Sequence, residues 1–166
     1  EMSETRGAIL ELGFPLLRVR SRTDWLIEKG VEVGVDRFIP IRWARTVREE
    51  HAARSSDRWR RILREAMKQS EGAWLPELAE AQAPDCDGLA PCIILADPEG
   101  PEEAPIDREI RAVRLLVGPE GGATDEERRR LTEAGARLWS LGPRRLRAET
   151  AALAALTLTM GASALN

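Results

Sequence analysis

The sequence contains few of the side chains that bind metal ions or form disulfide bonds. It has one histidine, His51, and two cysteines, Cys86 and Cys92, which lie six positions apart. This spacing does not match a Cys-x-x-Cys pair, so a metal site built from histidine and cysteine is disfavoured, and we expect no bound metal ion. The low cysteine content fits a protein of a reducing compartment, which predicts a cytoplasmic location.

Long apolar stretches are also missing. The longest uncharged stretch, residues 150–166, is shorter than the span of about 20 residues that crosses a membrane, and it contains several hydroxyl side chains. No signal peptide is evident, and we expect no membrane association. The apolar side chains of this stretch point to all sides of a helix, so we expect a buried helix that packs on two sides, for example against a sheet and a partner subunit.

Lysine is rare, and the positive charge comes almost entirely from arginine. Lys29 and Lys68 are the only lysines, the net charge is −3 and the isoelectric point is about 5.4. The chain therefore lacks the overall positive field that attracts nucleic acids to strongly basic proteins. The preference for arginine over lysine is more simply explained by genome composition than by phosphate recognition.

What the sequence does contain is enough apolar chain for one globular α/β domain. Hydrophobic residues make up 43% of the 166 positions and charged residues 32%. Thr124 and Glu127 have the spacing of a capping box, which marks the start of one helix. Apolar runs and helical periodicity predict strands at 38–41, 91–96, 113–117 and 137–141, and helices at 21–33, 56–70, 124–134 and from about 149 onward. This alternation predicts an α/β fold with a mostly parallel sheet and helices on both faces.

The amino-terminal segment is interpreted as an approach to this domain. Residues 1–20 contain one or two strands interrupted by Gly13 and Pro15, and they lead into a domain at 21–166. Residues 75–88 are rich in proline, alanine and acidic side chains, and we expect a loop with a short helix there.

Two loops carry the chemistry, and each follows a predicted strand. They read Gly118-Pro119-Glu120-Gly121-Gly122 and Gly142-Pro143-Arg144-Arg145-Leu146-Arg147. Because parallel strands end at one edge of a sheet, where open α/β folds bind ligands, we expect both loops to face one site. The glycines let a flat heterocycle approach the main chain, whereas the missing lysine of a phosphate-binding loop disfavours a nucleotide-phosphate site. The arginines of the second loop indicate an anionic substrate.

These two motifs resemble the paired signature of a known family. Leu116-Val-Gly-Pro-Glu-Gly-Gly122 and Leu141-Gly-Pro-Arg-Arg-Leu-Arg-Ala-Glu-Thr-Ala151 are similar to those of the RsmE family of 16S ribosomal RNA uridine methyltransferases, within the SPOUT superfamily. The resemblance extends upstream to residues 25–35, 39–41 and 65–70. It implies a carboxyl-terminal deep trefoil knot, S-adenosylmethionine as cofactor and a homodimer. Family members carry an amino-terminal PUA-like RNA-binding domain, for which this sequence has no room.

The resemblance implies methyl transfer to N3 of a uridine in the 16S ribosomal RNA of the 30S subunit. The target base must be unpaired or flipped out, because its Watson–Crick edge carries N3. Two other functions stay open. One is a different SPOUT enzyme that methylates the ribose 2′-hydroxyl of transfer RNA, and the other is a non-catalytic domain that binds cofactor or RNA.

The resemblance also suggests roles for individual residues. We hypothesise that Arg147 binds the uridine carbonyl oxygens or a flanking phosphate and stabilises the developing anion. Glu149 either accepts the N3 proton or is a first-turn residue favoured by the helix dipole, and Glu120 either binds cofactor or holds its own loop. The loop at Asp97 is expected to form a third wall of the cofactor pocket. The candidate cofactor-binding residues are Leu95, Leu116, Gly118, Pro119, Glu120, Gly121, Gly122, Leu141, Gly142, Pro143 and Leu146. Candidate RNA contacts are Arg20, Arg22, Arg144 and Arg145.

Overall fold

A computed structural model describes residues 9–46, 51–85, 92–106 and 109–162 of the chain. Cys86, together with the start of the strand predicted at 91–96 and the end of the helix predicted to run to 166, lies outside the described residues.

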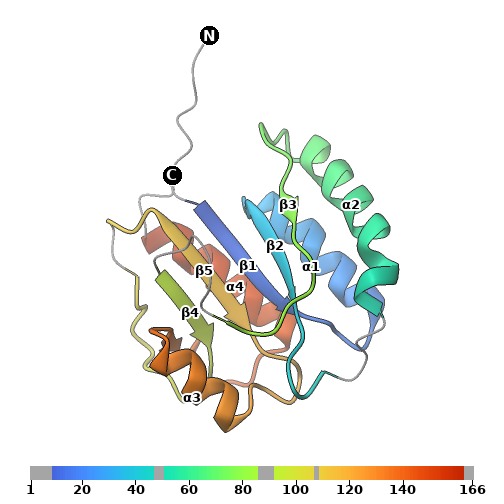
Figure 1. Cartoon of the computed structure of the whole chain (residues 1–166). Helices are drawn as coiled ribbons and strands as arrows, with labels where there is room; N and C mark the ends of the chain where they lie inside the picture. Colours follow the sequence, from blue (N-terminus) through green and yellow to red (C-terminus); the bar gives the residue numbers. More distant parts are fainter. Residues whose placement is uncertain (1–8, 47–50, 86–91, 107–108, 163–166) are drawn as a thin grey trace.

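Six parallel strands form a single sheet. Their order is β3-β2-β1-β5-β4-β6, and every strand pair is parallel. The strands are β1 (Ile9–Pro15), β2 (Arg37–Ile41), β3 (Glu77–Leu78), β4 (Cys92–Ala96), β5 (Ala112–Val117) and β6 (Arg137–Trp139). The predicted parallel sheet is confirmed, and all its strands end at the same edge (Figure 1).

Helices cover both faces of this sheet. They are α1 (Arg20–Glu32), α2 (His51–Gln69), α3 (Asp125–Glu133) and α4 (Ala148–Ala162). Figure 1 shows α3 on one face, with α1 and α4 on the other. The predicted α/β class is therefore confirmed, while the deep knot stays a prediction from the family resemblance. None of the helices that the structure describes combines the length and the apolarity of a membrane-crossing segment.

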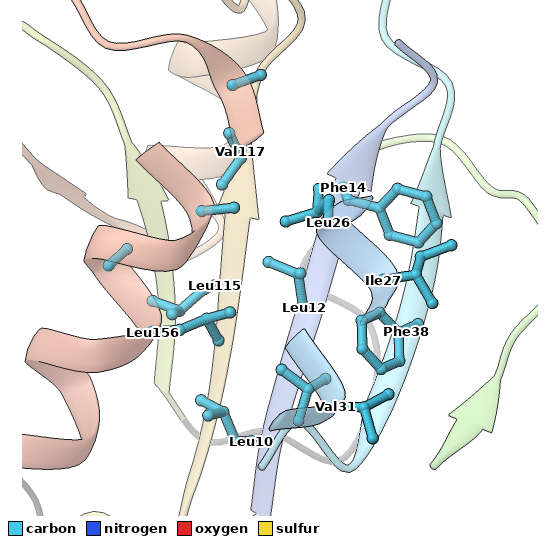
Figure 2. Close-up of a cluster of buried hydrophobic side chains, with 14 of the residues drawn as sticks. Leu10, Leu12, Phe14, Leu26, Ile27, Val31, Phe38, Leu115, Val117 and Leu156 are labelled. Carbon is cyan, nitrogen blue, oxygen red and sulfur yellow. The ribbon is translucent and has the colours of Figure 1, made fainter. Parts of the chain in front are cut away.

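The larger hydrophobic core lies between the sheet and α1, α2 and α4. Figure 2 shows side chains of β1 and β5 alternating onto this face, among them Leu10, Leu12, Leu115 and Val117. A smaller core on the other face joins Leu131 of α3 to β2, β4 and β5. Because parallel strands are buried on both sides, their sequences are continuous apolar runs, which is why these strands could be predicted.

The amino-terminal segment differs from the prediction. Instead of an interrupted approach to the domain, β1 is one continuous strand in the middle of the sheet, paired with β2 and β5. Gly13 lies inside this strand. A side chain would not fit there, because a Cβ would be 2.4 Å from Leu116 Cδ2 and 3.2 Å from Ile41 Cγ1. The glycine permits close packing in the sheet rather than breaking the strand, and the expected boundary between residues 20 and 21 is not a structural one.

Local signals account for other elements unevenly. The capping box of α3 is confirmed: the hydroxyl of Thr124 accepts the Glu127 main-chain N–H at 3.2 Å, and the Glu127 carboxylate accepts the Thr124 main-chain N–H at 2.8 Å. The short helix expected within 75–88 is absent from the described residues up to Asp85. These residues instead form β3 and a bridge between Ile41 and Gln82.

Candidate functional site

A cavity of about 830 Å³ opens at the carboxyl-terminal edge of β4, β5 and β6. Three loops line it, at residues 96–102, 117–123 and 139–148, together with Arg45, Arg128 and Ala151. The two sequence motifs therefore face one cavity, as predicted, and the loop at Asp97 lines the same cavity as a third wall. That the cavity binds the cofactor stays a prediction.

The glycine-rich loop at 118–122 is a tight turn with a fixed shape. The Gly122 N–H donates to the Pro119 carbonyl at 2.8 Å, and Gly122 has a φ of 72°, a left-handed conformation that favours glycine. At Gly118 a Cβ would lie 3.1 Å from the main-chain nitrogen of Ala123. Side chains other than hydrogen are therefore disfavoured at both positions.

Two arginines from outside the loop hold its carbonyl groups. Arg45, in the segment after β2, donates from Nη1 to the Gly121 carbonyl at 2.6 Å. Arg145, in the second loop, donates from Nη2 to the Glu120 carbonyl at 3.1 Å. Since two carbonyls are already bound by guanidinium groups, the turn is preorganised before any ligand arrives.

The second loop turns sharply between β6 and α4. Gly142 has a φ of 107°, and the Ser140 N–H donates to the Pro101 carbonyl at 2.8 Å, which ties this loop to the third one. Ala148, the first residue of α4, follows directly after Arg147. The start of α4 therefore forms part of the cavity wall.

The third loop is held by a buried carboxylate. Asp97 accepts the Glu99 N–H at 2.9 Å and the Nε–H of Arg128 at 3.0 Å. This hydrogen bond is the main reason that the pKa of Arg128 is raised. A Cβ at Gly100 would lie 2.5 Å from the Trp139 nitrogen, so the loop packs flush against the backbone of β6.

Two of the three arginines of the second loop line the cavity with guanidinium groups that form no hydrogen bond or ion pair with the described residues. They are Arg144 and Arg147, and the positive charge of Arg147 lies close enough to Glu149 to help lower the pKa of that carboxyl. Arg145 also lines it but is engaged by the Glu120 carbonyl. The cavity therefore offers two guanidinium groups to an anionic ligand.

Glu149 and Arg22 lie just outside the cavity and form a two-pronged ion pair. Arg22 donates from Nε to Glu149 Oε1 at 2.7 Å and from Nη2 to Oε2 at 2.5 Å. Its Nη1 donates to Glu120 Oε1 at 3.0 Å. The hydrogen bond from Arg22 is the main reason that the pKa of Glu149 is lowered, and burial opposes that shift. Arg20, the other candidate from this region, is exposed at the first position of α1.

Two of the predicted cofactor residues do not reach the cavity. The side chains of Leu95 and Leu116 are fully buried and belong to the smaller core on the α3 face. Successive side chains of a strand point to opposite faces, and the cavity is lined instead by Ala96 and Val117, the last residues of β4 and β5. The other predicted cofactor residues do line it: Gly118, Pro119, Glu120, Gly121, Gly122, Leu141, Gly142, Pro143 and Leu146.

Sequence reasoning missed Arg45, Gly100 and Arg128 as residues of the site. Gly100 lies in a strand-end loop that had been recognised, and the rule used for the other two loops would have included it. Arg45 and Arg128 carry no such signal, since their roles depend on contacts with Gly121 and Asp97 far along the chain.

The described residues hold no group of three or more His, Cys, Asp or Glu side chains placed to bind a metal ion. Cys92 is a buried free cysteine, and burial raises the pKa of its thiol, which keeps it protonated and unreactive.

The same fold occurs in a known methyltransferase structure. The SpoU methyltransferase AviRb of Streptomyces viridochromogenes has the same fold, with a TM-score of 0.57 over 95% of this chain and 62% of that chain, at 16% identity. More specifically, residues 9–160 match the model of the RNA methyltransferase domain family, and the chain belongs to that family. The match begins within β1, which agrees with its central position in the sheet.

Curated relatives confirm the resemblance seen in the motifs. The ribosomal RNA small subunit methyltransferase E of Bacillus subtilis is 32% identical over 157 residues, which cover 82% of this chain and 59% of the relative. The protein of the same name from Aquifex aeolicus is 31% identical, over 82% of this chain and 62% of the relative. The chain therefore spans about three fifths of the length of these relatives.

Two solved structures extend the comparison to cofactor complexes. A methyltransferase from Legionella pneumophila, in complex with S-adenosylmethionine, has a TM-score of 0.83 at 28% identity, over 95% of this chain and 67% of that chain. The ribosomal RNA small subunit methyltransferase E of Neisseria gonorrhoeae is also bound to S-adenosylmethionine. It has a TM-score of 0.81 at 26% identity, over 97% of this chain and 69% of that chain.

Proposed function

We propose that this chain transfers the methyl group of S-adenosylmethionine to N3 of a uridine in 16S ribosomal RNA. The observation that carries the proposal is the cavity itself, because the glycine-rich loop and the arginine-rich loop of the family signature meet there. The relatives named as small-subunit methyltransferases support the substrate. The choice of N3 rests on the family resemblance.

The cavity fits the proposed cofactor in size and chemistry. Its volume of about 830 Å³ lies in the range of small-molecule sites. Main-chain groups of residues 118–122 and 140–143 suit a flat adenine ring, and Val117, Leu141 and Leu146 supply an apolar enclosure. S-adenosylmethionine supplies an activated methyl group on a sulfonium, so the protein has to bind, orient and exclude water.

Arg147 is the residue that we propose contacts the uridine. When N3 loses its proton, negative charge spreads onto the neighbouring carbonyl oxygens, and a guanidinium beside them stabilises that charge. Arg147 faces the cavity and has no carboxylate hydrogen-bonded to it in the described chain, so its donors are available for this contact. Arg144 is placed to bind a flanking phosphate, and Arg20 and Arg145 stay candidates for weaker RNA contacts.

For Glu149 we adopt the structural alternative to the role of proton acceptor. Its carboxylate does not line the cavity, and both of its oxygens accept hydrogen bonds from Arg22. The lowered pKa makes it a weaker base than an ordinary glutamate. We therefore propose that Glu149 anchors the first turn of α4, where a negative charge also favours the helix dipole.

We further propose that the protein acts as a homodimer on the 30S subunit, in the cytoplasm where ribosomes assemble. Leu158, on the outer side of α4, is 53% exposed, although most of the apolar side chains of this helix are covered. A second subunit on this side would bury Leu158 and complete the packing expected for an all-round apolar helix.

Three measurements test the proposal. Isothermal titration with S-adenosylmethionine should show one site per chain. Incubation with 30S subunits that lack the modification should then incorporate a methyl group, and mass spectrometry of the digested RNA should find N3-methyluridine. A ribose-methylated nucleoside would instead identify a different SPOUT activity. Cofactor binding without methylation of 30S subunits would indicate that the chain is a non-catalytic binding domain.

A further inference from the structure

Arg22 does not line the cavity, but it forms hydrogen bonds with two segments that border it. It lies in the first turn of α1, and its partners Glu120 and Glu149 are 98 and 127 residues further along the chain. Glu120 stands at the tip of the glycine-rich loop, and Glu149 stands in the first turn of α4. One guanidinium therefore joins three segments that meet only at this edge of the sheet.

The geometry of the contact requires arginine. A guanidinium has five N–H donors in one plane, so two of them can bind a carboxylate side by side while a third reaches another acceptor. Arg22 uses Nε and Nη2 for Glu149, at 2.7 and 2.5 Å, and Nη1 for Glu120, at 3.0 Å. A lysine ammonium is a single point charge and cannot span both carboxylates in this way.

The charge of the cluster argues against direct RNA binding. Arg22 faces two carboxylates, which neutralise its charge and occupy donors on Nε, Nη1 and Nη2, so little of it is left to bind a phosphate. The Glu149 side chain is 10% exposed, so this ion pair is screened by solvent less than a surface pair. Arg18, by contrast, is exposed and forms no ion pair with the described residues.

We infer that Arg22 is a positioning residue, which fixes the glycine-rich loop against the start of α4 and so holds the cofactor cavity in its binding shape. The other end of the same loop is fixed by Arg45, through the Gly121 carbonyl at 2.6 Å. Without Arg22, the hydrogen bond from Arg145 to the Glu120 carbonyl is the one side-chain contact that still holds Glu120 among the described residues. The inference rests on the proposed function for its cofactor readout.

Cofactor titration of matched variants tests the inference. If the released loop adopts the binding shape a tenth of the time, Arg22→Ala should raise the Kd for S-adenosylmethionine about tenfold. The Kd of Arg22→Lys should lie between the Kd of Arg22→Ala and that of the unaltered chain. Glu120→Gln, which weakens only the more exposed arm, should raise Kd less than Arg22→Ala. Arg18→Ala removes the same charge from the same region and should leave Kd unchanged.

An RNA-binding role would give the opposite pattern. Arg22→Ala would then bind S-adenosylmethionine like the unaltered chain, but its affinity for 16S RNA would fall and the salt dependence of binding would lose about one unit of slope. That result would overturn the inference. So would equal effects of Arg22→Ala and Arg18→Ala on the cofactor Kd.

A measurement without ligand separates this inference from the proposed function. Carboxyl NMR of the apo chain should show the pKa of Glu149 rising in Arg22→Ala, and amide exchange should become faster across residues 118–123. If the unaltered chain binds no S-adenosylmethionine, the proposed function is wrong, and these two readouts still decide the role of Arg22. Unchanged exchange and an unchanged pKa of Glu149 would overturn the inference.

Discussion

Glu11 and Arg114 form an ion pair inside the sheet, with Glu11 Oε2 and Arg114 Nε 2.7 Å apart and side-chain exposures of only 3% and 2%. Both residues lie on strands in the middle of the sheet, on the face that α3 covers only in part. Two further ion pairs extend it: Arg37 Nη1 lies 3.3 Å from Glu11 Oε1, and Asp85 Oδ1 lies 3.5 Å from Arg114 Nη1. Charges removed from water in this way are stable only while all partners are present.

Breaking this pair should destabilise the fold strongly. Glu11→Ala removes the short ion pair of the buried Arg114, and we expect the free energy of unfolding to fall by about 3–5 kcal/mol. Urea denaturation would measure the loss. Glu77→Ala removes the exposed partner of Arg37 and should cost no more than about 1 kcal/mol, so equal losses in the two variants would contradict the buried network.

A pair of glycine variants can separate the effect of backbone strain on stability from an effect on cofactor binding. Gly122 and Gly135 both have positive φ, 72° and 100°, and at both positions a Cβ meets no atom within 4 Å. Alanine at either position should cost about 1–2 kcal/mol of stability, because the left-handed conformation is unfavourable for residues with a Cβ. Gly122→Ala should also weaken binding of S-adenosylmethionine, whereas Gly135→Ala, at the end of α3 and outside the cavity, should bind it normally. Titration calorimetry distinguishes the two variants, and equal cofactor affinity would count against the loop as binding site.

Arg147 should affect the chemical step more than cofactor binding. Losing one donor that stabilises developing negative charge typically lowers kcat by about 10²–10³. We expect Arg147→Ala to show this loss in methylation of 30S subunits, with the Kd for S-adenosylmethionine within about twofold of the unaltered chain. Arg130→Ala, an exposed arginine of α3, is the matched control and should keep full activity. Normal methylation by Arg147→Ala would refute the role that we propose.

The sequence predicted those parts of the structure that depend on a local signal. Apolar runs predicted β2, β4, β5 and β6, the spacing of Thr124 and Glu127 predicted the start of α3, and the rule for strand ends brought the two motifs to one cavity. Gly13 misled the prediction because a glycine inside a strand has no local mark that separates a break from a close approach. Only the neighbouring Leu116 side chain, on a strand far along the chain, explains it.

Contacts between residues far apart in the chain could not be predicted from the sequence. The charges of Arg22, Glu120 and Glu149 were visible in the sequence, but their pairing depends on α1 and α4 beginning at the same edge of the sheet. The same limit explains Leu95 and Leu116. Their strands were predicted correctly, but which face each side chain occupies follows from the register of the complete sheet.

The ion pair of Arg22 and Glu149 should make stability depend on pH in the acidic range. The pKa of Glu149 is lowered in the folded chain, mainly by its hydrogen bond from Arg22, relative to about 4.3 for an unfolded glutamate. A lowered folded pKa contributes stability that is fully present above the unfolded pKa and is lost as pH falls through the folded pKa. The Tm of the unaltered chain should therefore exceed that of Arg22→Ala by a constant amount at pH 6–8, and this difference should shrink below about pH 4.

Thermal unfolding followed by circular dichroism from pH 3 to pH 8 would measure the difference in Tm. Arg18→Ala is the control, and its Tm should stay close to that of the unaltered chain throughout. A difference between the unaltered chain and Arg22→Ala that persists unchanged to pH 3 would show that the contribution of Arg22 comes from packing and not from its charge.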